Sequence, residues 1–297
     1  MTISETQFDT WAQQGPTPQF VATYNTIKTT LLDSKSPYYR RSFDVHLQGS
    51  YGNDTNIRGD SDVDIVIWTK DTFDYDLEHL PPDQKAAFER DYPSVPSAGP
   101  SFRSEVLSWL LKNYGTDVDP GNKAIHLKAT NYRRAADIIA CVEHRRYYRY
   151  VSATDQRYDT GVKFTTTHGI NVINFPKIHQ AECTAKQKTT GSYFKATARI
   201  FKNMRNRMIE RSIIREGLAP SYFIEGMLWN VPSDKYGKSF QSTVVNCLNW
   251  LHDCKRDDLV CANGLYYLLR DNAHNCWKPA DFETYLAATI KFYNDGG

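Results

Sequence analysis

Gln48-Gly49-Ser50-Tyr51 comes shortly before Asp62-Val63-Asp64 and the apolar run Ile65-Val66-Ile67-Trp68, and this stretch decides the fold. The apolar run predicts a buried strand. Successive strand residues point to opposite faces, so Asp62 and Asp64 point to the same face at the start of that strand. Two adjacent carboxylates repel each other and are costly to bury. We therefore expect a fold that supplies a cation to them.

Mg²⁺ suits this pair, because it prefers hard oxygen ligands and binds through one or two carboxylates plus substrate phosphates. The upstream turn at Gly49 and Ser50 offers backbone N–H groups and a hydroxyl that could hold the other phosphates of the same substrate. An acidic Asp-x-Asp alone is more often a solvated turn. In this order, leading into an apolar strand, the two motifs predict a metal-dependent site for nucleotidyl transfer.

The order Gly-Ser, spacer, Asp-x-Asp resembles the signature of the polymerase-β-like nucleotidyltransferase superfamily. The fuller stretch from Gln48 to Asp64 is similar to the cGAS/DncV-like nucleotidyltransferases, bacterial relatives of animal cGAS and oligoadenylate synthetase that make cyclic oligonucleotide signals in antiphage defence. The resemblance implies an α+β (mixed α/β) fold. A nucleotidyltransferase lobe with a mixed sheet would be joined to a helical lobe like that of oligoadenylate synthetase, with the active site in the cleft.

The family resemblance also requires a third carboxylate on a later strand. Two downstream runs, 124–128 and 135–142, are typical of strands. Asp137 is the only acid in the second run, and a lone Asp in an apolar strand is costly unless it is paired or bound to a cation. The alternative is an edge-strand Asp that faces water. We interpret Asp137 as the third metal ligand, and as the base or orienting group for the attacking hydroxyl.

Composition favours a protein of the reducing cytoplasm. The chain has 297 residues, 40% hydrophobic and 24% charged, which is ordinary for a soluble globular protein, and its net charge of +2 is too small to attract nucleic acid as a whole. Six cysteines without a C-x-x-C pair indicate free thiols, with Cys247, Cys254 and Cys261 at a helix-face spacing. The N-terminus lacks signal-peptide features, and no apolar run is long enough to span a membrane.

The remaining pattern predicts two lobes. Residues 1–180 would form the catalytic lobe, with an N-terminal helix that can bridge both lobes, and residues 181–297 a helical lobe that binds nucleotide or substrate. The acidic, proline-rich stretch 71–100 is predicted to be a surface excursion. The predicted elements are a helix over 17–34, a strand over 43–48, a helix over 102–114 capped by Ser101, short strands over 161–175 and a long helix over 192–214.

A basic stripe lies on the predicted long helix. Lys195, Arg199 and Lys202 are spaced i, i+4, i+7 and share one face. Most charged helix faces are simply solvated, but a triphosphate carries about four negative charges and needs cations around it. We therefore prefer phosphate binding by the stripe, with a solvated basic face as the alternative.

The resemblance assigns further nucleotide-binding residues. It implies that Lys202 contacts the donor triphosphate, as do Gln48, Gly49 and Ser50, and that Ser221 and Tyr222 contact phosphate and stack the base. Pro220 before Ser221 fits a helix start, where N–H groups favour phosphate, although Ser221 could serve as a cap alone. One departure is Ala140-Cys141-Val142 in place of the family's Pro-Cys-Phe type of sequence, which puts neighbouring base contacts in doubt.

The sequence Arg145-Arg146-Tyr147-Tyr148-Arg149-Tyr150 interleaves bases with aromatics. This pattern can bind single-stranded nucleic acid. It also fits a strand edge that contributes arginines to an acceptor or product surface, which is the interpretation we prefer.

The functional prediction is an Mg²⁺-dependent enzyme with two ions, Mn²⁺ being the alternative metal. It would join NTPs, ATP and a second NTP, into a cyclic di- or trinucleotide with pyrophosphate release. We expect a cytoplasmic monomer that does not bind a membrane and is not activated by nucleic acid. A regulatory protein is a candidate partner. The alternatives are a related nucleotidyltransferase acting on RNA, protein or a small molecule, and a non-catalytic nucleotide- or RNA-binding module.

Overall fold

The computed structural model describes residues 2–58, 62–93, 99–271 and 275–297. These divide into two compact units that interleave along the chain. Unit 1 comprises Met1–Pro16, Gly49–Asp60 and Lys177–Gly297, and unit 2 comprises Thr17–Gln48 and Ser61–Pro176. The lobes predicted from the sequence, 1–180 and 181–297, stay a prediction.

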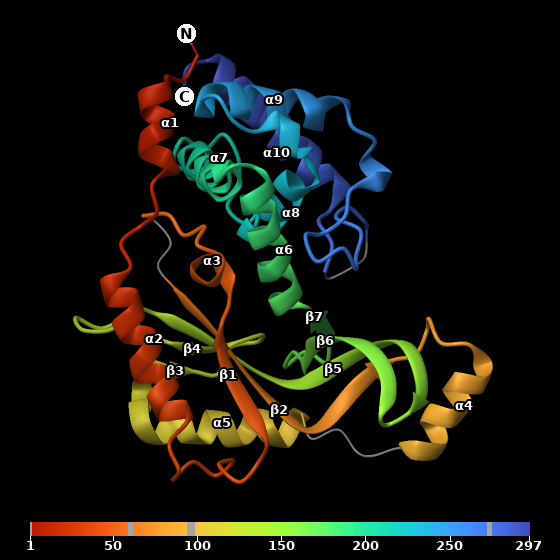
Figure 1. Cartoon of the computed structure of the whole chain (residues 1–297). Coiled ribbons are helices and arrows are strands. Elements are labelled where there is room, and N and C mark those ends of the chain that lie inside the picture. Colours follow the sequence, from red (N-terminus) through yellow and green to blue (C-terminus); the bar gives the residue numbers. More distant parts are fainter. Residues whose placement is uncertain (1, 59–61, 94–98, 272–274) are drawn as a thin grey trace. The chain divides into compact units, whose positions relative to one another are not determined.

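Unit 2 holds the sheet and the helices that cover it (Figure 1). Its elements are α2 (Pro18–Leu31), β1 (Phe43–Leu47), β2 (Val63–Asp76), α4 (Pro82–Asp91), α5 (Gly99–Tyr114), η1 (Gly115–Asp117), β3 (Val118–Asp119), β4 (Ile125–Leu127), β5 (Ala136–Ser152), β6 (Asp155–Thr165) and β7 (Asn171–Asn174).

Unit 1 is helical. Its elements are α1 (Glu5–Ala12), α3 (Gly49–Gly52), α6 (Pro176–Thr189), which begins at the last residue of unit 2, α7 (Tyr193–Glu210), α8 (Ser221–Asn230), η2 (Ser233–Lys235), α9 (Phe240–Asp253), η3 (Arg256–Asp258) and α10 (Pro279–Asn294).

The sheet is mixed, as predicted. Its strand order is β1-β2-β5-β4-β3, and β6 pairs with both β5 and β7. β2 and β5 run parallel, whereas the other pairings are antiparallel. The central strands form because their runs at 65–68 and 138–142 are rich in β-branched residues that are largely buried. The strand predicted over 43–48 is confirmed as β1.

Two helices pack together beside the sheet. The predicted helices over 17–34 and 102–114 are confirmed as α2 and α5, and Figure 1 shows α5 running along the sheet. The Trp109 indole N–H donates to the Thr30 carbonyl at 2.8 Å, and Tyr38 meets Phe102 edge to face. Ser101 lies inside α5, so its prediction as the cap is wrong.

The stretch 71–100 is not merely a surface excursion. β2 continues to Asp76, and α4 places Phe88, 0% exposed, in a cluster with Leu80, Tyr147 and Tyr150. The expectation of a solvated segment is therefore wrong where α4 packs against β5. Acids and prolines dominate the local composition, but a few apolar side chains find partners far along the chain. Residues 94–98 lie outside the described residues.

The basic–aromatic stretch 145–150 is part of β5, so the predicted strand is confirmed. The predicted strand edge is wrong at Arg145 and Arg146, because β5 pairs there with β2 on one side and β6 on the other. Tyr147 and Tyr150 are buried in the α4 cluster. The Arg145 guanidinium lies 3.8 Å from the Phe73 ring centroid, and Arg149 pairs with Asp155 at 2.7 Å. These aromatics and cations are thus used within unit 2.

The core of unit 1 surrounds α7. The long helix predicted over 192–214 is confirmed, and its apolar positions Phe194, Ala198, Phe201 and Met208 are all 0% exposed. α1, α8, α9 and α10 pack around them. α9 begins with a capping box between Ser239 and Ser242.

All six cysteines are free thiols, as expected. Cys247 and Cys261 are buried and Cys254 is half-buried. Cys261 lies beyond the end of α9, so the helix face predicted for the three is wrong at that position. Within the described ranges, no helix has the length and apolar character needed to cross a membrane.

Candidate active site

The three predicted metal ligands all belong to unit 2, and strand pairing brings two of them together. Asp64 on β2 and Asp137 on β5 are register partners in a parallel pair. Their side chains therefore lie on one face, on strands about 4.8 Å apart. Asp62 stands directly before β2, two residues from Asp64. All three residues are half-buried, while Val63 and Ala136 beside them are fully buried.

His126 is a neighbour that the sequence analysis missed. It is the register partner of Asp137 across the antiparallel β4–β5 pair, and its Nδ1 lies 2.9 Å from Asp137 Oδ1. Both side chains are 37% exposed, so the pair is accessible. The alternation Ile125-His126-Leu127 puts His126 on the polar face, but only the pairing register shows that it meets Asp137.

This donor set fits a hard divalent cation. The carboxylates of Asp64 and Asp137 offer oxygens on one half-buried face, the half-buried Asp62 is two residues from Asp64, and no sulfur ligand belongs to the set. His126 engages one oxygen of Asp137 and so orients the other, as groups around a metal ligand commonly do.

The predicted phosphate-binding turn belongs to unit 1. Gly49 has φ +69°, a left-handed conformation that favours glycine, and α3 begins there. The Asn53 N–H donates to the Gly49 carbonyl at 3.1 Å, and the Thr55 N–H donates to the Ser50 carbonyl at 2.8 Å. Gln48, just before the turn, belongs to unit 2, where its N–H donates to the Asp64 carbonyl at 2.9 Å.

The basic stripe of α7 is packed against the chain that follows this turn. Lys195 pairs with Asp54 at 2.9 Å, and Arg199 donates to the Asp54 carbonyl at 2.6 Å. Lys202 is 0% exposed, and its ammonium group donates to the Thr55 carbonyl at 2.8 Å. The alternative of a solvated basic face is therefore wrong. Phosphate contacts by these three residues stay predictions.

Ser221 and Tyr222 begin α8, which confirms the helix start predicted after Pro220. The Ser221 hydroxyl accepts a hydrogen bond from Arg205 at 3.1 Å. The Tyr222 ring stacks on His179, with centroids 4.6 Å apart, and its hydroxyl accepts from Asn263 at 3.1 Å. Burial raises the pKa of the Tyr222 phenol well above its usual value, so it stays neutral.

Known proteins resemble this chain over nearly its whole length. A family model for the C-terminal helical domain of cGAS/DncV-like nucleotidyltransferases matches residues 181–294. The cyclic nucleotide synthase CdnE01 of Staphylococcus haemolyticus is 33% identical, covering 99% of this chain and 100% of its own. A cyclic UMP-AMP synthase of Rhodothermus marinus is 34% identical, covering 89% of this chain and 88% of its own. The chain belongs to the cGAS/DncV-like nucleotidyltransferases.

Solved structures agree with that membership. The Rhodothermus marinus CdnE c-UMP-AMP synthase, solved with Apcpp and Upnpp, has a TM-score of 0.87 at 33% identity, over 99% of this chain and 98% of the other. The Elizabethkingia meningoseptica CdnE cyclic dinucleotide synthase has a TM-score of 0.77 at 24% identity over 99% of both chains, which supports the fold alone. The predicted family, the mixed α/β fold and the class of enzyme are confirmed. The individual residue roles stay predictions.

A second group of metal-ligand types lies inside unit 1. His179, Cys183 and Glu225 are all buried, and their ligand atoms lie within 4.8 Å of one another. The Glu225 carboxylate already accepts hydrogen bonds from Asn53, Thr55 and His179. Among the residues that the structure describes, the other His179 nitrogen, Nδ1, has no hydrogen-bond partner, whereas a metal-bound histidine usually donates from its second nitrogen. We interpret this group as a hydrogen-bonded network.

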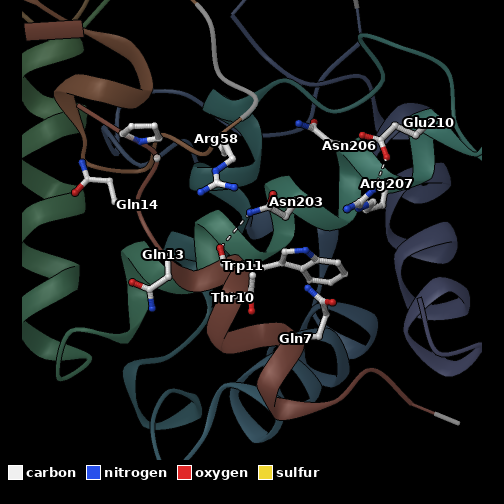
Figure 2. Close-up of a pocket in the computed structure, with 12 residues that line it drawn as sticks. Gln7, Thr10, Trp11, Gln13, Gln14, Arg58, Asn203, Asn206, Arg207 and Glu210 are labelled. Atoms are coloured by element: carbon white, nitrogen blue, oxygen red, sulfur yellow. Dashed lines mark hydrogen bonds and ion pairs between the residues drawn. The ribbon is translucent and has the colours of Figure 1, made fainter. Parts of the chain in front are cut away.

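Unit 1 also contains a polar cavity of about 640 Å³ between α1, α7 and Arg58 (Figure 2). Several lining side chains form hydrogen bonds or ion pairs with nearby protein groups. Asn203 donates to the Trp11 carbonyl at 3.1 Å, Gln14 donates to Asn56 at 2.8 Å, and Arg207 pairs with Glu210 at 2.8 Å. The cavity shares no residue with the predicted nucleotide-binding set, and its lining indicates no particular ligand.

Proposed function

We propose that this protein joins NTPs into a purine-containing cyclic di- or trinucleotide with release of pyrophosphate. The observation that carries the proposal is the register pairing of Asp64 with Asp137, with Asp62 two residues away. Family membership supports the reaction class. Nucleotide binding alone would not require three carboxylates, so the trio favours a working enzyme over a binding scaffold.

Two Mg²⁺ ions, or Mn²⁺ in their place, would activate the attacking ribose hydroxyl and stabilise the leaving pyrophosphate when held by Asp62, Asp64 and Asp137. His126 occupies Oδ1 of Asp137, which leaves Oδ2 to orient the hydroxyl or accept its proton. Gly49, Ser50, Lys202 and Ser221 would hold the β- and γ-phosphates, with Gln48, Lys195 and Arg199 supporting them. Positioning and electrostatics then lower the barrier, without a covalent intermediate on the enzyme.

The names of the relatives do not decide which bases this protein joins. Those relatives include a cyclic UMP-AMP synthase and a cyclic dipurine nucleotide synthase, so similar chains are named for different products. Tyr222 would stack the donor base, and stacking selects only weakly among bases. We infer ATP as one substrate with a second NTP, and a cytoplasmic monomer that signals in antiphage defence without a nucleic-acid activator. A regulatory protein is its candidate partner.

Incubation of the protein with Mg²⁺ and the four NTPs should release pyrophosphate and leave a product resistant to phosphatase. The double variant Asp62→Asn, Asp64→Asn should abolish both signals, because it removes the charge that would hold the metal. The double variant Asp257→Asn, Asp258→Asn, at two exposed acids in η3, is the matched control and should keep both.

Full activity in the first double variant would refute the proposal. Pyrophosphate release that depends on added RNA, protein or another small molecule would instead identify a different nucleotidyltransferase. Tight RNA binding without pyrophosphate release would favour the non-catalytic binding module.

A further inference from the structure

Glu225 is a buried carboxylate to which the reaction above assigns no role. It lies on α8, is 2% exposed, and belongs entirely to unit 1. Asn53 Nδ2 and His179 Nε2 each donate to it at 2.8 Å, and the Thr55 hydroxyl donates to its other oxygen. A buried charge is tolerated only when it is hydrogen-bonded and balanced, and Glu225 meets both conditions.

Lys202 supplies part of the balancing charge. Burial works to raise the pKa of Glu225, but the hydrogen bond from His179 and the charge of Lys202 hold that pKa below its usual value. Lys202 also donates to the Thr55 carbonyl at 2.8 Å. Thr55 is therefore held at two points, through its side chain by Glu225 and through its main chain by Lys202.

The residues that Glu225 holds are those that close the Gly49–Ser50 turn. The Asn53 N–H bonds to the Gly49 carbonyl, and the Thr55 N–H bonds to the Ser50 carbonyl. A shift of Asn53 or Thr55 would move the carbonyls of Gly49 and Ser50 with it. The carboxylate thus sets the geometry of the turn without touching a substrate itself.

The same network also supports Tyr222, the predicted base-stacking residue, through His179. Because a carboxylate only accepts hydrogen bonds, His179 carries its proton on Nε2 to bond Glu225. This contact fixes the plane of the imidazole, and that plane stacks on Tyr222 with 22° between the rings. One face of Tyr222 is thereby held by a side chain that Glu225 orients.

We propose that Glu225 is a positioning residue that holds the phosphate-binding turn through Asn53 and Thr55 and the base-stacking Tyr222 through His179. The proposal rests on the function proposed above, since it assigns the triphosphate to Gly49 and Ser50 and the base to Tyr222. One buried carboxylate would then couple the recognition of both ends of the donor NTP.

Thr55→Val tests whether Glu225 holds the phosphate-binding turn, with Thr289→Val as the matched control. Both hydroxyls are on 0% exposed threonines, but that of Thr289 donates to the Tyr285 carbonyl within α10, away from the Gly49–Ser50 turn. Thr55→Val should raise the KM for NTP and the dissociation constant of a non-hydrolysable ATP analogue about tenfold, with kcat changed less than about threefold. Thr289→Val should leave all three within about twofold, at a comparable loss of melting temperature.

His179→Asn tests whether Glu225 positions Tyr222 through His179. It should change the ratio of the KM values for a purine and a pyrimidine NTP at least about threefold, because Tyr222 loses its stacked support, whereas Thr55→Val should leave that ratio unchanged. An unchanged ratio in His179→Asn would overturn the proposal that Glu225 positions Tyr222 through His179.

The two proposals fail differently. Absence of pyrophosphate release by the unaltered protein would refute the proposed function. An active protein in which Thr55→Val and Thr289→Val bind the ATP analogue equally well would overturn the role of Glu225 alone. Stoichiometric zinc in the purified protein, lost in Glu225→Gln, would also overturn it by making His179, Cys183 and Glu225 a metal centre.

Discussion

At the scale of single residues, the chemistry of Asp137 depends on two partners from different strands. Asp64 lies beside it through parallel pairing, and His126 lies on its other side through antiparallel pairing. Like charges at Asp64 and Asp137 repel, so a cation between them would be favoured. His126 fixes one oxygen of Asp137 at 2.9 Å, which reduces the freedom that metal binding would otherwise have to remove.

His126→Asn should therefore raise the Mg²⁺ concentration that gives half-maximal pyrophosphate release about tenfold, since the oxygen left on Asp137 is no longer oriented. Maximal velocity at saturating Mg²⁺ should fall less. The measurement is a Mg²⁺ titration at fixed NTP, and His168→Asn, at an exposed histidine, is the control. An unchanged Mg²⁺ requirement would mean that His126 does not orient Asp137 for the metal.

At the scale of elements, the irregular part of β2 carries a partly buried charge cluster. The β2–β5 register shifts between Thr69 and Phe73, and Asp74 follows this bulge. Asp74 accepts from His144 at 2.7 Å and from Lys163 at 2.5 Å, which ties β2 to β5 and β6. Burial works to raise the pKa of Asp74, but these two partners outweigh it and hold the pKa below its usual value.

This shift predicts how the stability depends on pH. A carboxyl with a lowered pKa in the folded state contributes stability that is present above its unfolded pKa of about 4 and is lost as the pH falls through the folded value. The free energy of unfolding should therefore fall below pH 4 in the unaltered protein, and less steeply in Asp74→Asn. Urea unfolding at several pH values measures both slopes, and equal slopes would contradict the assignment.

Local patterns predicted the elements whose burial is periodic. The stripe of Phe194, Ala198, Phe201 and Met208 indicated α7, and the alternation at 43–48 indicated β1. Burial that depends on distant partners was not predictable in the same way. Phe88 lies in an acidic, proline-rich stretch, and its burial depends in part on Tyr147 and Tyr150, about 60 residues later.

The candidate site shows the same limit. Asp62 and Asp64 were predicted from the order of the Gly-Ser and Asp-x-Asp motifs before an apolar run, and Asp137 because the family resemblance requires a third carboxylate on a later strand. His126 and Glu225 were missed because a lone His or Glu becomes informative only once strand register or helix packing shows what it meets. Lys202 was chosen for its charge, but its buried contact with the Thr55 carbonyl could not be seen from helical spacing.

At the scale of the whole molecule, ring closure would require the proposed set of carboxylates, Asp62, Asp64 and Asp137, to act at least twice. The first transfer makes a linear intermediate, and closure uses the hydroxyl of the nucleotide that donated its phosphate first. An ATP analogue that lacks this hydroxyl should still serve in the first transfer but should not close the ring. The hydroxyl whose loss traps the linear product is therefore the one that forms the closing bond.

We expect mass spectrometry of reactions with Mg²⁺ and a second NTP to show a cyclic product from ATP. In a reaction in which ATP donates first, replacing it by one of the two analogues, 2′-deoxyATP or 3′-deoxyATP, should leave a linear product that still carries its triphosphate, because that analogue lacks the closing hydroxyl. The other analogue should still give a ring, and this difference assigns the linkage. Digestion of the ATP product with a linkage-specific nuclease is the independent check. A linear homopolymer as the only product from ATP would contradict cyclisation, while loss of that polymer in Asp137→Asn would still support the metal site.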